Sequence, residues 1–198
     1  MTRRRDCMAV VLVLVASSCG NNSHAVREGA VVASPGRLAS EALTIATPLV
    51  SAWDASATIR LIHGERIGLD GRSLSDGQWK IAAWSEQKGR QYWVIVKPDG
   101  GHEELERPAP DPASRDIITN VALGPIGVAR AWPETWIDSV VAIANARSHQ
   151  TGELHQVIGA SFNEKESVVL PGQAAWSIIF DQGDGHFIGA DGRYLGQH

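Results

Sequence analysis

The side chains that could do chemistry include seven histidines, two cysteines and scattered carboxylates, and their spacing matches no common catalytic or metal site. His102 is followed by two glutamates, but a zinc-protease helix needs a second His four residues later, where Glu106 stands. His149 and His155 lie six residues apart on either side of Gly152, a spacing that common zinc sites do not use. We therefore expect no metal and no cofactor.

Two Asp-Gly segments are nearly identical. Residues 67–74 read IGLDGRSL and residues 188–195 read IGADGRYL. Asp-Gly is common in tight turns, so each segment is predicted to be a turn. The alternative is that the Arg beside the turn binds a ligand carboxylate, and we prefer the turn. Residues 181–186, DQGDGH, are rich in Asp and Gly like a calcium loop but lack the alternating oxygen ligands and the distal Glu of an EF-hand. A solvated turn is the better interpretation of this segment.

Nucleophilic catalysis has no recognisable motif. Ser161 lies in Gly-Ala-Ser-Phe-Asn, which lacks the second Gly of a Gly-x-Ser-x-Gly elbow. After residue 18 the chain offers no Cys except Cys19, and no pair of carboxylates is singled out by its spacing. We predict that the protein is not an enzyme and has no catalytic residues.

Residues 1–18 are predicted to be a lipoprotein signal peptide, with three arginines followed by a short apolar run. Residues 8–16 are far fewer than the roughly 20 that span a bilayer. Ala16-Ser17-Ser18-Cys19 resembles the lipobox of bacterial lipoproteins, although Ala16 replaces the usual Leu. The resemblance implies that Cys19 becomes a lipidated N-terminus whose acyl chains, such as palmitate, anchor the protein in a membrane. The alternative is an ordinary signal peptide that leaves Cys19 as a free thiol.

The composition agrees with an exported protein that does not bind nucleic acid. The other cysteine, Cys7, lies in the signal, so the mature chain forms no internal disulfide. Without residues 1–18 the count of Lys and Arg falls from 18 to 15 and that of Asp and Glu from 22 to 21, so the net charge is about −6. No basic run remains to bind nucleic acid. Gly20 after the cysteine favours the outer membrane over the inner one, with the protein facing the periplasm.

The folded part is predicted to be α+β, built from two tandem units in which a helix precedes an antiparallel meander. Residues 91–102, QYWVIVKPDGGH, are echoed by residues 174–186, AAWSIIFDQGDGH. Trp93 and Trp176 are 83 residues apart, as are Trp53 and Trp136, and an internal duplication explains this spacing.

The predicted organisation places a flexible tether before the first unit and a Pro-rich linker between the units. The helices are expected to begin near Pro48 and Pro133 and to end at Gly64 and Gly152. The strands are expected at residues 78–85, 91–97, 102–106, 154–163, 174–181 and 185–191. The charged strand 102–106 is expected at a sheet edge. The predicted boundaries are 19–43 for the tether, 44–107 for the first unit, 108–127 for the Pro-rich linker with its extended connection, and 128–198 for the second unit.

This arrangement resembles the PepSY-like domains, small modules of the bacterial envelope. The resemblance covers residues 47–106 and 133–195 and depends on the helix-then-meander order with a Trp-led strand and a Gly/Asp turn. The Pro-rich linker and residues 65–74 are not part of that pattern. The resemblance implies a binding or inhibitory module rather than a catalyst.

Trp79 and Trp84 are the candidate partner-binding residues. They lie in one predicted strand at an odd separation, so they point to opposite faces of the sheet. Trp is enriched at binding hot spots, and we expect Trp84 to contact a partner on the sheet face away from the helices. The expected function is to bind or restrain another envelope protein from a lipid anchor. Two alternatives stay open: an envelope hydrolase whose site combines dispersed carboxylates and His, and a small-ligand or metal carrier with a groove between the units.

Overall fold

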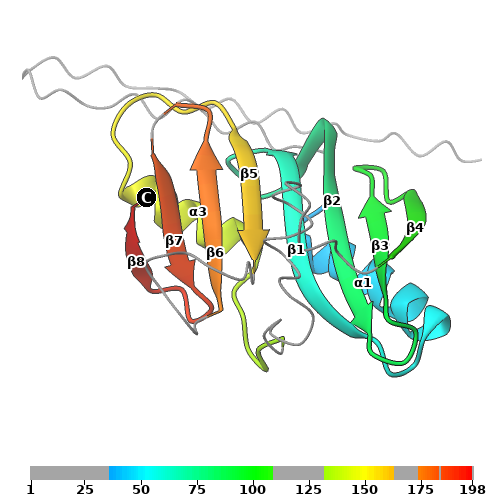
Figure 1. The fold of residues 1–198 in the computed structure, drawn as a ribbon. Helices are drawn as coiled ribbons and strands as arrows, with labels where there is room; N and C mark the ends of the chain where they lie inside the picture. The colour runs from blue at the N-terminus through cyan, green and yellow to red at the C-terminus, as the bar shows by residue number, and fades with distance from the viewer. Residues whose placement is uncertain (1–35, 109–131, 163–173, 183, 198) are drawn as a thin grey trace, which may run out of the picture. The chain divides into compact units, whose positions relative to one another are not determined.

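The structure is a computed structural model that describes residues 36–108, 132–162, 174–182 and 184–197. In these residues one antiparallel sheet has the strand order β4-β3-β2-β1-β5-β6-β7-β8, and two helices cover one of its faces (Figure 1). We call the opposite face the helix-free face. The helices are α1 (Ala39–Trp53) and α3 (Ser139–Ser148), and the strands are β1 (Thr58–Ile67), β2 (Ser73–Ser85), β3 (Arg90–Val96), β4 (His102–Pro108), β5 (Val157–Phe162), β6 (Ala175–Phe180), β7 (Gly185–Gly189) and β8 (Tyr194–Gln197).

The predicted fold class, α+β with two tandem helix-and-meander units, is wrong. The described residues form a largely β structure with a single eight-stranded sheet and two short helices. The two meanders are joined because β1 pairs with β5, with Ile62 opposite Phe162 and Ile67 opposite Val157. An unpaired β1 edge would present a row of free N–H and C=O groups, and the β5 pairing satisfies them. Spacing within each segment does not show which strand edges meet, so this pairing was missed.

One hydrophobic core lies between the sheet and both helices. It combines buried side chains of α1 and α3 with alternate residues of β1, β2, β3, β5, β6 and β7. Trp79 of β2 and Trp176 of β6 are fully buried in it and meet edge to face, with 6.3 Å between the ring centroids. Because both halves of the sheet contribute to the same core, neither half is packed independently of the other.

The two tryptophans occupy matching positions in the two halves of the sheet. Nε1 of Trp79 donates to the carbonyl of Arg37 at 2.7 Å, just before α1, and Nε1 of Trp176 donates to the carbonyl of Ile137 at 2.9 Å, just before α3. Arg37 and Ile137 are 100 residues apart in the sequence. The 83-residue spacing therefore does not relate equivalent positions. It pairs Trp93 of β3 with Trp176 of β6, whereas the equivalent of Trp176 is Trp79 of β2.

The first helix was placed too late. It begins at Ala39 and ends at Trp53, so Pro48 lies inside it and the predicted start of the first unit at residue 44 falls within it. The predicted helical residues 58–64 belong to β1. The four-residue spacing that indicated a helix continues through Leu61 by coincidence, whereas Ile59, Leu61 and Ile62 belong to a run rich in β-branched side chains.

The beginnings of the two helices meet at Asp138. Its Oδ1 atom accepts hydrogen bonds from the backbone N–H groups of Ser139, at 2.7 Å, and of Ser40, at 3.1 Å. The hydroxyl of Ser139 accepts from the N–H of Ala39 and donates to the carbonyl of Gly71. A carboxylate at a helix N-terminus satisfies free N–H groups and opposes the helix dipole, and here one carboxylate does so for both helices.

The remaining strand predictions are confirmed to within a few residues, and β4 lies at the sheet edge as expected. The short β8 was not predicted. All of β4 is exposed, and its charged side chains, three Glu and one Arg, suit an edge that must avoid pairing with other chains. Within the described part of the chain, no helix is long and apolar enough to cross a membrane.

Candidate functional site

The helix-free face carries a row of residues that runs across all eight strands. His63 on β1 and Lys80 on β2 lie opposite each other, and both point to the helix-free face. Residues that lie opposite each other on neighbouring strands point to the same face, so their partners on the other strands lie on this face too. From β4 to β8 the row reads Glu103, Ile95, Lys80, His63, Ser161, Ser177, Phe187 and Gly196. The two halves of this row differ: the β2–β4 side is large and charged, and the β5–β8 side is mostly small.

The two candidate tryptophans lie on opposite faces, which confirms that part of the prediction. Trp79 lies wholly in the core, where it is 0% exposed and has no surface to offer to a partner. Trp84 lies on the helix-free face and is 7% exposed. Its neighbours in the ladder are Gln91 of β3 and Thr58 of β1. The partner-binding role of Trp84 stays a prediction.

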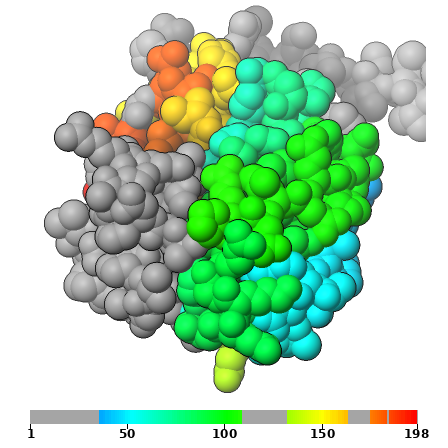
Figure 2. Space-filling view, turned by 45° about the vertical axis from the view of Figure 1, so that its right-hand side comes forward, coloured from blue at the N-terminus to red at the C-terminus, as the bar shows by residue number. Residues whose placement is uncertain are grey.

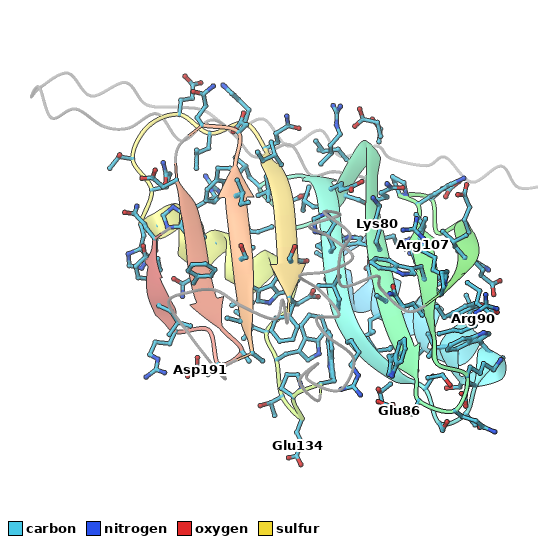
Figure 3. The ribbon with its side chains drawn as sticks, in the orientation of Figure 1. Lys80, Glu86, Arg90, Arg107, Glu134 and Asp191 are labelled. Atoms are coloured by element: carbon cyan, nitrogen blue, oxygen red, sulfur yellow. The ribbon has the colours of Figure 1, made fainter. Side chains whose placement is uncertain are left out.

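The side chains around Trp84 form what we call the tryptophan row: Thr58, Trp84, Gln91 and Arg107, on β1, β2, β3 and β4 in that order. The Arg107 guanidinium lies over the ring of Trp93, 5.7 Å from its centroid. The Trp93 indole N–H in turn donates to Oε1 of Gln91 at 2.9 Å. In Figure 2 the green residues of β2, β3 and β4 form one continuous surface, and Arg107 is labelled in Figure 3.

Two donors in the tryptophan row lack acceptors. Nε1 of Trp84 and Nε2 of Gln91 are buried, and no described residue accepts a hydrogen bond from either atom. A buried donor without a partner costs about 1–3 kcal/mol relative to a satisfied one. Such groups are rare in folded proteins, and each one calls for an explanation.

A second polar cluster lies where the two halves of the sheet meet. Nδ1 of His63, on β1, lies 2.6 Å from Oγ of Ser161 on β5. Its other ring nitrogen, Nε2, lies 3.5 Å from Oε1 of Glu65. Glu65 also accepts hydrogen bonds from Lys80 and, at 2.7 Å, from Nε2 of Gln78. Lys80 is labelled in Figure 3.

The charge on Glu65 fixes the roles of the two histidine nitrogens. The hydrogen bond from His63, together with those from Lys80 and Gln78, holds the pKa of Glu65 far below its usual 4.5. An ionised carboxylate only accepts, so Nε2 of His63 carries the hydrogen that faces Glu65. In the neutral form of the ring, Nδ1 would then accept a hydrogen bond from the hydroxyl of Ser161, which lies 2.6 Å away. This is the order of nucleophile, base and carboxylate found in serine hydrolases, with the two ring nitrogens exchanged.

The sequence contained no signal for this cluster. His63 and Ser161 are 98 residues apart, and they meet only because β1 pairs with β5. The sequence around Ser161 predicts no nucleophile, because the second Gly of a nucleophile elbow is missing. The structure agrees that there is no elbow, since Ser161 lies within a regular strand and is 5% exposed. There is open space beside it, because a Cβ atom added to Gly159 would meet no atom within 4 Å.

The two near-identical Asp-Gly segments are turns, as predicted. In each, the N–H of the first Gly donates to the carbonyl of the Arg, at 2.7 Å from Gly68 to Arg72 and at 2.8 Å from Gly189 to Arg193. Arg72 pairs with Glu41 of α1 at 3.0 Å, so its guanidinium serves the fold rather than a ligand.

The other histidines and acidic residues also have structural contacts. His149 stacks on the ring of Tyr194, and Oδ1 of Asp181 accepts from the backbone N–H groups of His155 and Gln156. In the described ranges, no three His, Cys, Asp or Glu side chains are placed to hold a metal ion.

A hollow of about 490 Å³ is lined by Ser75, Asp76, Gly77, Gln78, Lys97, Pro98 and Asp99. Its charges are largely neutralised, since Asp76 pairs with Arg66 and Lys97 with Glu103.

Cys19 and the predicted lipobox lie outside the described residues, as do residues 109–127 of the predicted linker and the predicted strand end at residue 163.

Comparisons with protein-family models, with curated proteins and with solved structures find no match. The resemblance to PepSY-like domains and to bacterial lipoproteins therefore stays a prediction.

Proposed function

We propose that this protein is a lipid-anchored envelope protein that binds another envelope protein through its helix-free face. The observation that carries the proposal is the one-sided helix layer. Both helices cover the same face of an eight-stranded sheet, and the opposite face combines large aromatic side chains with exposed charged and apolar ones. Aromatic residues and Arg are the side chains most often found at binding hot spots.

The best-placed contact residue on that face is Leu105. It lies on β4 opposite Trp93, is 38% exposed, and has the exposed side chains of Glu103 and Arg107 on either side along its strand. Large apolar residues at such exposure are natural contact points when a polar rim surrounds them. Trp84 and Trp93 beneath this rim support the surface rather than form its outermost layer.

The test is a photocrosslink from residue 105 in living cells, with Val141 as the matched control. Val141 is another exposed apolar residue, 49% exposed, but it lies on α3 and therefore on the helix side. A photoreactive amino acid at position 105 should give a single protein adduct, and the same group at position 141 should not. The Cys19→Ala variant should lose the adduct, because without its anchor the protein is no longer held at the membrane.

A second function, ester hydrolysis, is favoured by the His63–Ser161 contact. Ser161 would attack the carbonyl carbon of an ester, its proton passing to Nδ1 of His63, and Glu65 would stabilise the imidazolium. The alcohol leaves with that proton, and water then hydrolyses the acyl-serine by the same route. Base catalysis of this kind is worth on the order of 10²–10⁴-fold in rate.

Labelling by a fluorophosphonate tests this second function. The probe should modify wild type at Ser161 and should fail on Ser161→Ala. The matched control is Ser177→Ala, since Ser177 is the neighbour of Ser161 in the same row and faces the same side. Equal labelling of wild type and Ser161→Ala, or no labelling of either, would leave the cluster as a purely structural hydrogen bond.

A further inference from the structure

The two buried donors of the tryptophan row would both be satisfied by the same kind of ligand atom, a hydrogen-bond acceptor. Nε1 of Trp84 and Nε2 of Gln91 belong to residues that lie directly opposite each other on β2 and β3. Both groups donate and neither accepts. The exposed residues Thr58 and Arg107 lie at the two ends of the same row, and the two buried donors lie between them. An acceptor that enters here would meet two N–H donors that are already in position.

The orientation of the Gln91 amide cannot be reversed to remove this donor. The Trp93 indole can only donate a hydrogen bond, so the Gln91 atom that it contacts at 2.9 Å must be the oxygen. The amide nitrogen therefore points away from Trp93 with both of its hydrogens. Gln91 is held in the donor orientation that a ligand oxygen would need.

The charge beside these donors is positive. Arg107 lies opposite Gln91 and contacts the Trp93 ring, and no described carboxylate pairs with its guanidinium. Arg guanidinium binds carboxylates through two parallel hydrogen bonds, and such charged bonds are about twice as strong as neutral ones. Because Arg107 is exposed, its side chain can swing aside as a ligand enters and then close over it.

We propose that Trp84, Gln91 and Arg107 form a carboxylate-binding site that receives an acidic side chain of the protein partner. This inference rests on the proposed function, because it names what that partner inserts. The Trp84 indole and the Gln91 amide would bind one carboxylate oxygen, and Arg107 would bind the other. The site should bind a neutral amide of the same shape more weakly than a carboxylate, because the NH₂ group of the amide would face another hydrogen-bond donor.

The test is an NMR titration of the full-length protein with ¹⁵N-labelled tryptophan, using the α-amide of N-acetylglutamate as the probe and the α-amide of N-acetylglutamine as its neutral isostere. The Trp84 indole resonance, assigned by its loss in Trp84→Phe, should shift with the acid and not with the amide. The Trp79 indole, which already donates to a backbone carbonyl, should not move. Arg107→Ala should weaken the affinity on the order of 10-fold. Arg90→Ala is the matched control, since Arg90 is an exposed arginine already paired with Glu106.

A second variant keeps the proposal testable if the affinity for the free amino acid is low. Gln91→Glu retains the acceptor for Trp93 and places a carboxylate within the site. The Trp84 indole resonance should then be shifted without any ligand, and adding the α-amide of N-acetylglutamate should have no further effect. A Trp84 resonance that moves neither with the acid nor in Gln91→Glu would overturn the proposal.

If residue 105 crosslinks to a partner while this titration fails, the docking face stands without a carboxylate site. A successful titration without a crosslink would retain the site but remove the protein partner.

Discussion

The carboxylate of Glu65 accepts hydrogen bonds from three side chains, and each of them favours its charged form. His63 contributes most to the lowered pKa, and Lys80 and Gln78 add to it. All three come from β1 and β2, so the carboxylate is held by the fold rather than by solvent. The charge of Glu65 is therefore tied to folding.

Stability should therefore depend on the ionisation of Glu65. In the unfolded chain its pKa is near 4.5 and in the folded chain it is lower, so its contribution is present above about pH 4.5 and is lost as the pH falls through the folded value. We expect Glu65→Gln to be less stable than wild type at pH 7. The difference in unfolding free energy should shrink as the pH is lowered from about 5 toward about 2. Urea unfolding at several pH values measures it, and a difference that does not change with pH would contradict this account.

At the scale of elements, the two near-identical turns differ in the space around their second glycine, Gly71 in one and Gly192 in the other. Gly71 and Gly192 both adopt the left-handed conformation, with φ of 80° and 87°. A Cβ atom on Gly71 would lie 2.5 Å from the backbone nitrogen of Val140, at the start of α3. The closest atom to a Cβ on Gly192 would be a side-chain carbon of Ile137, at an ordinary 3.6 Å. Only the first turn is packed directly against a helix backbone.

Alanine at these two positions should separate conformational strain from packing. Gly192→Ala should cost about 1–2 kcal/mol, the penalty for a left-handed residue with a Cβ atom. Gly71→Ala should cost roughly 1–3 kcal/mol more, because the backbone of α3 must move to make room. Chemical denaturation of both variants gives the comparison directly. Equal destabilisation would mean that the β1–β2 turn is not fixed against α3 as described.

Local patterns predicted most of the elements and few of the contacts between them. The strands 78–85 and 91–97, the charged edge strand and the Asp-Gly turns follow from alternation and turn chemistry and are confirmed. The first helix was misplaced because a four-residue spacing ran by chance into β1. The β1–β5 pairing depends on which strand edges meet, and no spacing within the sequence carries that information.

The same distinction explains what was predicted of the candidate site. Opposite orientations of Trp79 and Trp84 follow from the two-residue period of a strand, and the structure confirms them. The His63–Ser161 contact could not be predicted, because it forms across the β1–β5 boundary. The unpaired donors of Trp84 and Gln91 could not be predicted either, since they emerge only when neighbouring strands are in register.

At the scale of the whole molecule, one core lies between the sheet and both described helices, and no described helix covers the opposite face. All the described residues belong to one compact unit, and both halves of the sheet lie within it. The helix-free face therefore extends over eight strands rather than four. The contact points that this face offers to a partner lie on β4, where Leu105 is exposed, because Ser161 and Ser177 on the other half are buried.

The measurement that tests this account most directly is the crosslink from residue 105 compared with residue 141. We expect an adduct of defined mass from position 105 in wild-type cells and none from position 141, and we expect Arg107→Ala to reduce its yield. Adducts of equal yield from both positions, or adducts from position 141 alone, would contradict the claim that the helix-free face is the binding surface.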